Sequence, residues 1–437
     1  MSRARFLLRQ HAYDADRSLL FRPALILAAL SFAAVFLPFA EERWPAWRAF
    51  GAKLTWAVPA EPSAVQVVLA TIAGSVMTVV SIVYSVLIVA LSLASVQFSP
   101  RIMAGFMRDR ISQRILGLFI GTFTYCLLVL RSTHSEPSPF VPTLSVFGAL
   151  LLAVACLGSL LFFVHHMAQA MQANFIVDRI AAETERVIDA VLSPQNKASK
   201  PAPPRPAETP QSAILSTASG YVQLWAAADL AQIASVHNVT LHVVRSMGHF
   251  VPEGGVLMVA SGPLPENAQQ TCRDALDLGP VRTMQDDLEF GLRQIVDIAL
   301  KAISPAVNDP STAVTCIDHL SRLLGRIARR GDASSTLFAD DGRALVVFPP
   351  TGFQRAMDVA FHQIRQYGKG DVAVVLRLAR ALLDITSMTN HPEHRRTLAE
   401  HTRLLKTATL QIPTEDRAEL DNRLALLAEQ LQHTGAA

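Results

Sequence analysis

The sequence has few charged residues and only a small excess of one sign of charge. Asp, Glu, Lys and Arg make up 17% of the 437 residues, whereas 51% are hydrophobic. This balance is too apolar for an average soluble enzyme, and the chain is too long to consist of membrane spans alone. The net charge of +3 at pH 7 is too small to support nucleic-acid binding. We therefore expect a membrane protein with an additional soluble part and no nucleic-acid partner.

The chain also lacks the cysteine spacing of a disulfide framework or a zinc site. Its four cysteines stand singly, without a CxxC pair: Cys126, Cys156, Cys272 and Cys316. We expect buried thiols in a reducing compartment. The densest histidine group, His391, His394 and His401, matches no metal motif, and we expect it on a solvated helix face. The sequence therefore predicts neither a bound metal nor a cofactor.

Four apolar segments stand out against the polar background. They cover about residues 24–40, 63–98, 115–130 and 142–164. Each meets or approaches the roughly 20 residues that a helix needs to cross a bilayer. Arginines are concentrated before the first segment and between the second and third, which is typical of cytoplasmic flanks. We predict four transmembrane helices with both termini in the cytoplasm.

A proline-rich segment at residues 193–212, "SPQNKASKPAPPRPAETPQS", has no hydrophobic periodicity and is typical of a linker. It would divide a four-helix transmembrane domain with a helical extension, residues 1–192, from the rest of the chain. A small β-rich subdomain is predicted at 213–265 and a mainly helical subdomain at 266–437. The pattern "GHFVPEGGVLMV" favours a small β-barrel-like portion, and Asp341-Gly342 predicts a hairpin. The expected fold class is a membrane α-helical region followed by a cytoplasmic α+β domain, and no internal repeat is visible.

The second apolar segment carries a row of hydroxyl groups. At about 100° per residue, six of them fall on one helix face: Thr71, Ser75, Thr78, Ser81, Ser85 and Ser92. Close helix packing explains such a face, because small residues let membrane helices approach each other. Alternatively, the face lines a water-filled pore in an oligomer. It carries no Asp, Glu, Lys or Arg, which argues against a proton-coupled transporter.

Oxygen-bearing side chains gather in the stretch at residues 282–320, "RTMQDDLEFGLRQIVDIALKAISPAVNDPSTAVTCIDHL". Four of them are candidates for ligand binding at a helix-turn-helix corner: Asp287, Asp297, Asn308 and Asp309. Helix capping and solvated helix faces account for most of them. The same oxygens could instead hold a ligand or a divalent cation. Because no nucleophile–base pair or phosphate loop accompanies them, we predict no enzymatic activity.

Two stretches carry a resemblance to a known family. They are residues 282–320 and residues 96–131, "VQFSPRIMAGFMRDRISQRILGLFIGTFTYCLLVLR". Both resemble the bacterial predicted membrane proteins catalogued as domain of unknown function twenty-two fifty-four, and the resemblance covers nearly the whole chain. It implies a bacterial inner-membrane protein with four N-terminal spans and a cytoplasmic C-terminal domain. The family carries no settled activity.

Two functions fit these patterns. The first is a homo-oligomeric inner-membrane pore, with the second apolar segment lining the path and the cytoplasmic domain regulating it. The second is a membrane-anchored cytoplasmic sensor or scaffold that binds a ligand, a metal ion or a partner. The partners expected are membrane lipid and further copies of the same chain.

Overall fold

The computed structural model describes residues 21–97, 109–133, 140–192, 212–284, 287–332, 336–349, 352–408 and 414–432. The chain divides between Gln172 and Ala173 into two compact units, which we call the membrane unit and the C-terminal unit. The predicted linker lies outside the described residues, apart from Ser212 at its end.

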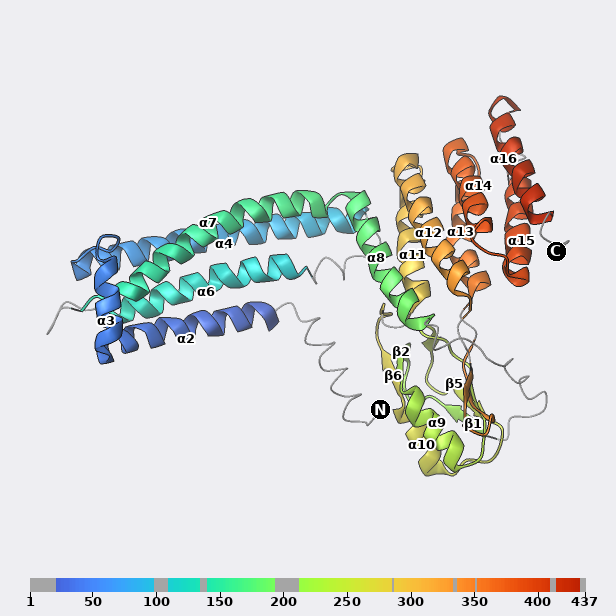
Figure 1. The fold of residues 1–437 in the computed structure, drawn as a ribbon, viewed down its shortest axis with the longest axis horizontal. Helices are drawn as coiled ribbons and strands as arrows, with labels where there is room; N and C mark the ends of the chain where they lie inside the picture. The colour runs from blue at the N-terminus through green and yellow to red at the C-terminus, as the bar shows by residue number, and fades with distance from the viewer. Residues whose placement is uncertain are drawn as a thin grey trace. The chain divides into compact units, whose positions relative to one another are not determined.

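The membrane unit contains four helices that are long and apolar enough to cross a membrane (Figure 1). They are α2 (Phe21–Arg43), α4 (Pro62–Gln97), α6 (Arg110–Ser132) and α7 (Thr143–Ala170). The short helices α3 (Pro45–Gly51) and η1 (Ala52–Leu54) lie between α2 and α4. All four predicted spans are therefore present as helices, and the chain is a multi-pass membrane protein.

Helix α6 lies at the centre of this unit, because it packs against α2, α4 and α7. Half of its most apolar stretch is buried, against 22% in each of the other three spans. A Cβ atom at Gly117 would lie 2.9 Å from Cα of Pro23, and one at Gly121 would lie 2.6 Å from Cδ1 of Leu30. The two glycines form a GxxxG motif and thus let α2 approach α6 closely.

The C-terminal unit begins with α8 (Ala173–Val191). The sequence predicts this helix as an extension of the transmembrane domain. In the structure it belongs to the C-terminal unit instead. The helix packs against α11 (Leu288–Ala302) and α12 (Pro310–Arg330). Its apolar face, with Ile176 and Ile188, is buried there. An amphipathic helix belongs to the unit that covers its apolar face.

Six helices of the C-terminal unit form a two-layered array. After α11 and α12 follow α13 (Phe353–Tyr367), α14 (Val372–Thr386), α15 (Pro392–Ala408) and α16 (Thr414–Gln432). Helices α11, α13 and α15 pack in succession, and α12, α14 and α16 form the second layer. Figure 1 shows the resulting stacked pairs. This is the arrangement of an α-solenoid. Its stacked helices need apolar faces that match those of their neighbours, but the structural repeat does not require a recognisable repeat in the sequence.

The strands of the C-terminal unit form two open sheets, ordered β1-β5-β3-β8-β7 and β4-β2-β6. Their bounds are β1 (Ser212–Leu215), β2 (Gly220–Trp225), β3 (Leu241–Val243), β4 (Phe250–Val251), β5 (Val256–Ala260), β6 (Leu276–Gly279), β7 (Thr336–Phe338) and β8 (Ala344–Val347). The described residues form no closed barrel, so that expectation is wrong. The turn at Gly254, with φ of 74°, joins two strands that enter different sheets.

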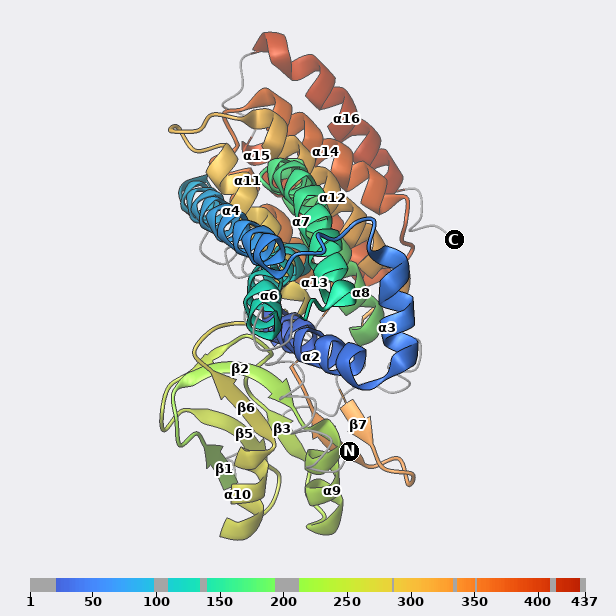
Figure 2. The same ribbon diagram turned by 90° about the vertical axis from the view of Figure 1, so that its left-hand side faces the viewer.

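The predicted boundary between residues 265 and 266 does not separate two subdomains. Strand β3 pairs in parallel with β8, about a hundred residues later in the chain. Helices α9 (Ala227–Val236) and α10 (Glu266–Asp274) contribute to the same apolar core as the five-stranded sheet (Figure 2). The β-rich part is therefore assembled from segments on both sides of the helices α11 and α12.

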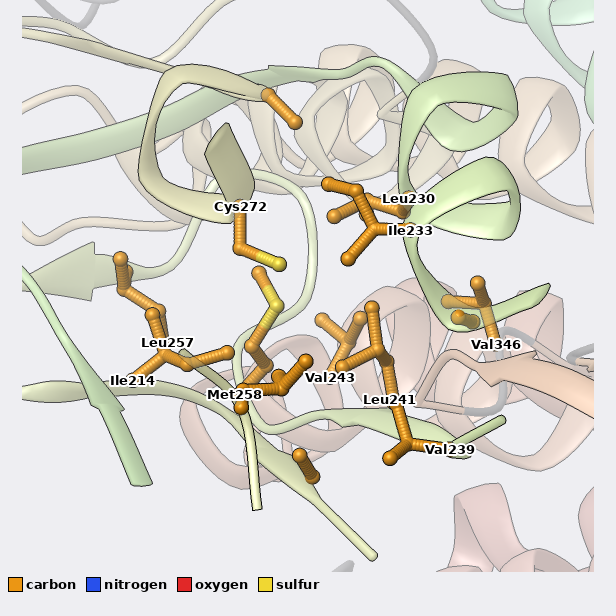
Figure 3. Close-up of a cluster of buried hydrophobic side chains, with 14 of the residues drawn as sticks. Ile214, Leu230, Ile233, Val239, Leu241, Val243, Leu257, Met258, Cys272 and Val346 are labelled. Carbon is orange, nitrogen blue, oxygen red and sulfur yellow. The ribbon is translucent and has the colours of Figure 1, made fainter. Parts of the chain in front are cut away.

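The core between this sheet and its helices contains one of the four cysteines. Cys272 of α10 and Met258 of β5 point toward each other among Leu230, Leu241 and Val346 (Figure 3). All four cysteines are buried and free, as the sequence predicts. The predicted hairpin is also present, since β7 and β8 pair around Gly342, whose φ is 84°.

Replacing Gly117 by leucine tests the close contact between α2 and α6. The new side chain would meet the backbone of Pro23, so we expect a loss of about 1–3 kcal/mol of stability from overpacking. Thermal unfolding of the full chain in detergent measures this loss. Gly158→Leu on α7 is the matched control, because no heavy atom lies within 4 Å of a Cβ there. Equal melting temperatures for both variants would contradict the packing described.

Candidate functional site

The hydroxyl face of α4, defined by Thr71, Ser75, Thr78, Ser81, Ser85 and Ser92, is exposed along its whole length. Its side chains also bond to their own helix. The hydroxyl of Thr71 donates to the carbonyl of Val67 at 2.7 Å, and that of Ser85 donates to Ser81 at 2.9 Å. Thr78 and Ser81 donate in the same way to the carbonyls four residues earlier, at 3.1 and 3.2 Å. Each hydroxyl oxygen keeps acceptor capacity directed away from its helix.

The opposite face of α4 holds the helix in the bundle. Val76, Val80 and Val83 are buried in a cluster with Phe119 of α6 and Phe163 of α7. At about 100° per residue, these valines lie on the far side of the helix from the hydroxyls. Most of the hydroxyl face therefore points away from α6 and α7 of the same chain, and only Thr71 and Ser75 border a groove toward α7. Packing among the described residues of one chain does not explain the other hydroxyls, whereas packing between copies of the chain still can.

The acidic corner predicted from the sequence is divided by the structure. Asp287 lies at the start of α11, whereas Asn308 and Asp309 follow its end, about 22 Å away along a helix of 15 residues. Asp297 is half-buried on α11 between them. Within the described parts of the chain, no group of three or more His, Cys, Asp or Glu side chains is placed to hold a metal ion. The four residues do not form one site.

Asp287 is a buried helix cap. It is 3% exposed, and its Oδ1 accepts a hydrogen bond from the backbone of Phe290 at 3.1 Å. Arg282 donates to both carboxylate oxygens, at 2.5 and 2.8 Å. Burial raises the pKa of Asp287 against the opposing effect of Arg282. Gly248, with φ of 73°, lies so close to this ion pair that any side chain there would collide with it.

Asn308 and Asp309 form the entry to α12. Asn308 adopts the left-handed conformation with φ of 51° and is exposed. Asp309 caps the helix, because its oxygens accept from the backbone and the hydroxyl of Thr312, at 3.1 and 2.5 Å. The Thr312 hydroxyl is the main reason that the pKa of Asp309 is lowered. Capping thus accounts for the positions of Asp287 and Asp309.

The histidines of α15 lie in the interior, so the expectation of a solvated face is wrong for His394 and His401. They are 2% and 4% exposed. His394 contacts the ring of Phe353 and lies 3.0 Å from the hydroxyl of Thr389. His401 lies 3.2 Å from Asp358 of α13. The packing of α13 on α15 covers this face, and nothing local in the sequence indicates that contact.

A carboxylate–imidazole pair joins α6 to α7 in the membrane unit. Asp109 caps α6 by accepting from the backbone of Ser112 at 3.0 Å, and its Oδ2 lies 2.8 Å from Nε2 of His166. Burial acts to raise the pKa of Asp109, but hydrogen bonds from Ser112 and His166 outweigh it and lower that pKa. The sequence signals the cap, an acid followed by Ser three residues later. It does not signal a partner 57 residues away.

Ion pairs attach α8 to α12. Arg326 donates to both oxygens of Asp189, at 2.7 and 2.6 Å, and Arg330 lies 2.9 Å from the same carboxylate. On the neighbouring helix α11, Gly291 leaves room for the fully buried Thr184 of α8. Only Met171 and Gln172 separate the end of α7 from the start of α8. The last span is thus linked to the C-terminal unit by two residues and a firmly packed helix.

Comparison with known proteins identifies the family. The family model described as predicted membrane protein, DUF2254, matches residues 16–384. The chain belongs to this family. It is 32% identical over 341 residues to an uncharacterized protein of Mycobacterium bovis and to one of Mycobacterium tuberculosis. The match covers 75% of this chain and 65% of each relative, so it spans less than two thirds of their length. No solved structure matches the chain.

Membership of this family of predicted membrane proteins confirms the resemblance inferred from residues 96–131 and 282–320, both of which lie within the matched region. The family description agrees with the four apolar helices of the membrane unit. The relatives are bacterial. Neither the family description nor the names of the relatives assigns a ligand or a reaction.

Replacing Gly291 by valine tests how α8 is held. A branched side chain would collide with Thr184, whose hydroxyl already donates to Ile180 at 2.7 Å, and we expect overpacking to cost about 1–3 kcal/mol. Hydrogen exchange measured by mass spectrometry should show faster exchange of residues 173–191. Gly370→Val is the control, because a Cβ there meets no atom within 4 Å. Unchanged protection of α8 in Gly291→Val would refute the contact.

The pair of Asp109 and His166 predicts a pH dependence. Because the pKa of Asp109 is lowered in the folded protein, its charge stabilises the fold above the unfolded pKa of about 3.9. That contribution is lost as the pH falls through the folded pKa. Asp109→Asn keeps a capping side chain but loses the charge-assisted hydrogen bonds, which contribute about 1.5 kcal/mol at neutral pH.

Melting temperatures measured from about pH 6 down to about pH 3 test this linkage. The wild type should lose its advantage over Asp109→Asn toward the acidic end. Glu42→Gln, at an exposed carboxylate of the same unit, should give a curve parallel to the wild type. Parallel curves for wild type and Asp109→Asn would show that the pair adds no stability.

Proposed function

We propose that the protein is a homo-oligomeric pore of the bacterial inner membrane, with α4 lining the path and the C-terminal unit regulating it. The observation that supports this proposal is the direction of the hydroxyl face, which points away from the bundle of its own chain. Symmetric association of several copies around one axis would bring these faces together.

The chemistry of the face suits a permeation path. A helix surface that meets only lipid gains nothing from six hydroxyl side chains. In a water-filled path, by contrast, the hydroxyls hydrogen-bond to water and help to solvate ions. Four of the hydroxyls, those of Thr71, Thr78, Ser81 and Ser85, donate hydrogen bonds to backbone carbonyls of α4, so their oxygens present acceptors outward. No acidic or basic side chain lies on the face to trap a permeating ion.

The length of α4 supports the same arrangement. Its 36 residues correspond to about 54 Å, well over the roughly 30 Å of the hydrocarbon core. We place both termini in the cytoplasm, following the concentration of arginines in the flanking segments. The end of α4 that carries Ser92 then extends toward the cytoplasm. A regulatory signal would reach α7 through the two-residue connection to α8.

A membrane-anchored scaffold or sensor is the second candidate, and the two-layered array of α11 to α16 favours it. Stacked helical hairpins of this kind present extended surfaces that bind other proteins. In that case the spans serve as an anchor, and the partner binds regardless of substitutions on α4. The acidic corner gives this candidate no support, because its residues do not converge on one site.

The pore is tested by single-channel recording of the purified full chain in planar bilayers. Ser81→Phe places a bulky ring on the hydroxyl face and should lower the unitary current severalfold, whereas Ser81→Thr keeps a hydroxyl and should conduct. Leu161→Phe is the matched control, because Leu161 is an exposed residue of α7 outside this face. Native mass spectrometry establishes that all variants keep one oligomeric state.

Two results would refute the pore. The first is the absence of discrete currents in the wild type under varied voltage, membrane tension and divalent ion concentration. The second is an equal reduction of the current by Ser81→Phe and Leu161→Phe, which would indicate a general effect of the added aromatic ring. A protein partner that binds wild type and Ser81→Phe equally, without any current, would favour the scaffold.

A further inference from the structure

The membrane unit has a groove between α4 and α7 with α6 at its floor. Its volume is about 230 Å³. Thr71, Ser75 and Val79 line one side, and Ala153, Leu157 and Leu160 line the other. The floor is formed by Phe119, Val76 and Cys156, all of them buried. The groove exists because small side chains, Ala153 above all, stand where larger ones would close it.

The groove lies at the depth of the hydrocarbon. Residues 71–79 and 153–160 are about 14 to 26 Å along α4 and α7 from the ends at which these helices begin. That places the groove within the roughly 30 Å occupied by acyl chains rather than by head groups. At this depth, the part of a lipid that reaches the groove is its acyl chain rather than its head group.

Water is a poor occupant of this groove. A groove of about 230 Å³ has room for several waters, and each of them needs two to four polar partners. Seven of its ten lining residues are aliphatic or aromatic, and the polar ones are Thr71, Ser75 and Cys156. The hydroxyl of Thr71 already donates to Val67, and the thiol of Cys156 donates to Thr122 at 3.4 Å, so these two groups offer water only acceptors. An empty groove is also unfavourable, because its walls would lose their dispersion contacts.

We propose that an acyl chain of a bilayer phospholipid occupies this groove as a bound lipid. The chain would lie between α4 and α7 and contact Phe119 at the floor, deeper than the first layer of lipid around the protein. This site stands beside the hydroxyl face, since Thr71 and Ser75 border both. A single copy of the chain provides the complete lining, so the site needs no second copy.

Photo-crosslinking of the full chain tests the proposal. The protein is reconstituted in vesicles of phosphatidylethanolamine and phosphatidylglycerol that contain a phospholipid with a diazirine on its acyl chain. After illumination, peptide mass spectrometry maps the labelled residues. We expect labelling of the lining residues above that of Val154 and Leu161, which are exposed on α7 outside the groove. The lining residues to be compared are Thr71, Ser75, Val79, Phe119, Ala153, Leu157 and Leu160.

Ala153→Phe fills the groove and should lower its labelling about tenfold, a ratio that corresponds to about 1.4 kcal/mol. Ala155→Phe makes the same change at an exposed position of the same helix and should leave the labelling unchanged. Thr71→Leu fills the groove from α4 and gives an independent variant, should Ala153→Phe fail to fold. Thermal unfolding identifies variants that are folded.

Two results would overturn the site. One is uniform labelling of all exposed apolar residues, unaffected by Ala153→Phe and Thr71→Leu. The other is labelling of Val154 and Leu161 without labelling of the groove, which would show that lipid reaches α7 but does not enter the groove. Labelling is measured without any current, so its outcome is separate from the fate of the proposed pore.

Discussion

The membrane unit depends on the packing of α6 against the other three spans. In a bilayer, helices gain little from hiding apolar side chains, so close van der Waals fit decides which faces meet. Gly117 and Gly121 provide that fit for α2. Phe119 and its neighbours in the same cluster provide a close fit for α7 and for the face of α4 that carries Val76, Val80 and Val83. Because α6 and α7 cover these valines, the opposite face of α4 has no partner among the described residues apart from the groove that Thr71 and Ser75 border. The exposure of its hydroxyls follows from this choice.

The same packing gives α4 two different surroundings along its outer side. Its hydroxyl face is available to another copy of the chain or to a water-filled path. Its border toward α7 forms the apolar groove, where Thr71 and Ser75 meet Ala153. In the proposed pore, α4 would contact both bound lipid and further copies of the chain. This combination is the reason that we propose α4, rather than the acidic residues of the C-terminal unit, as the functional part of the molecule.

In the C-terminal unit, polar residues that attract attention in the sequence are used to build structure. Asp287 and Asp309 begin consecutive helices, and the helix between their positions keeps them apart. Arg282 and Gly248 then enclose Asp287. The ion pairs of Asp189 with Arg326 and Arg330 fasten α8, and through it the end of the last span, to the helical array. Because Asp189 is partly exposed, each of these ion pairs contributes little stability. The bidentate contact with Arg326 and the sharing of the carboxylate with Arg330 nevertheless fix the orientation of α8.

Local patterns in the sequence were sufficient for the spans, the hydroxyl row of α4 and the hairpin at Gly342. Each of these depends on residues within one or two helical turns or strands, where periodicity and turn preference act directly. The pairing of β3 with β8, the burial of His394 and His401, and the contact of Asp109 with His166 depend on segments far apart in the chain. Only the tertiary structure decided these three features. The residues next to a side chain in the sequence do not indicate which distant segment will pack against it. The orientation of the hydroxyl face depends on both the sequence and the tertiary structure. The sequence places the hydroxyls on one side of α4, and the packing of the opposite side against α6 and α7 leaves the hydroxyls exposed.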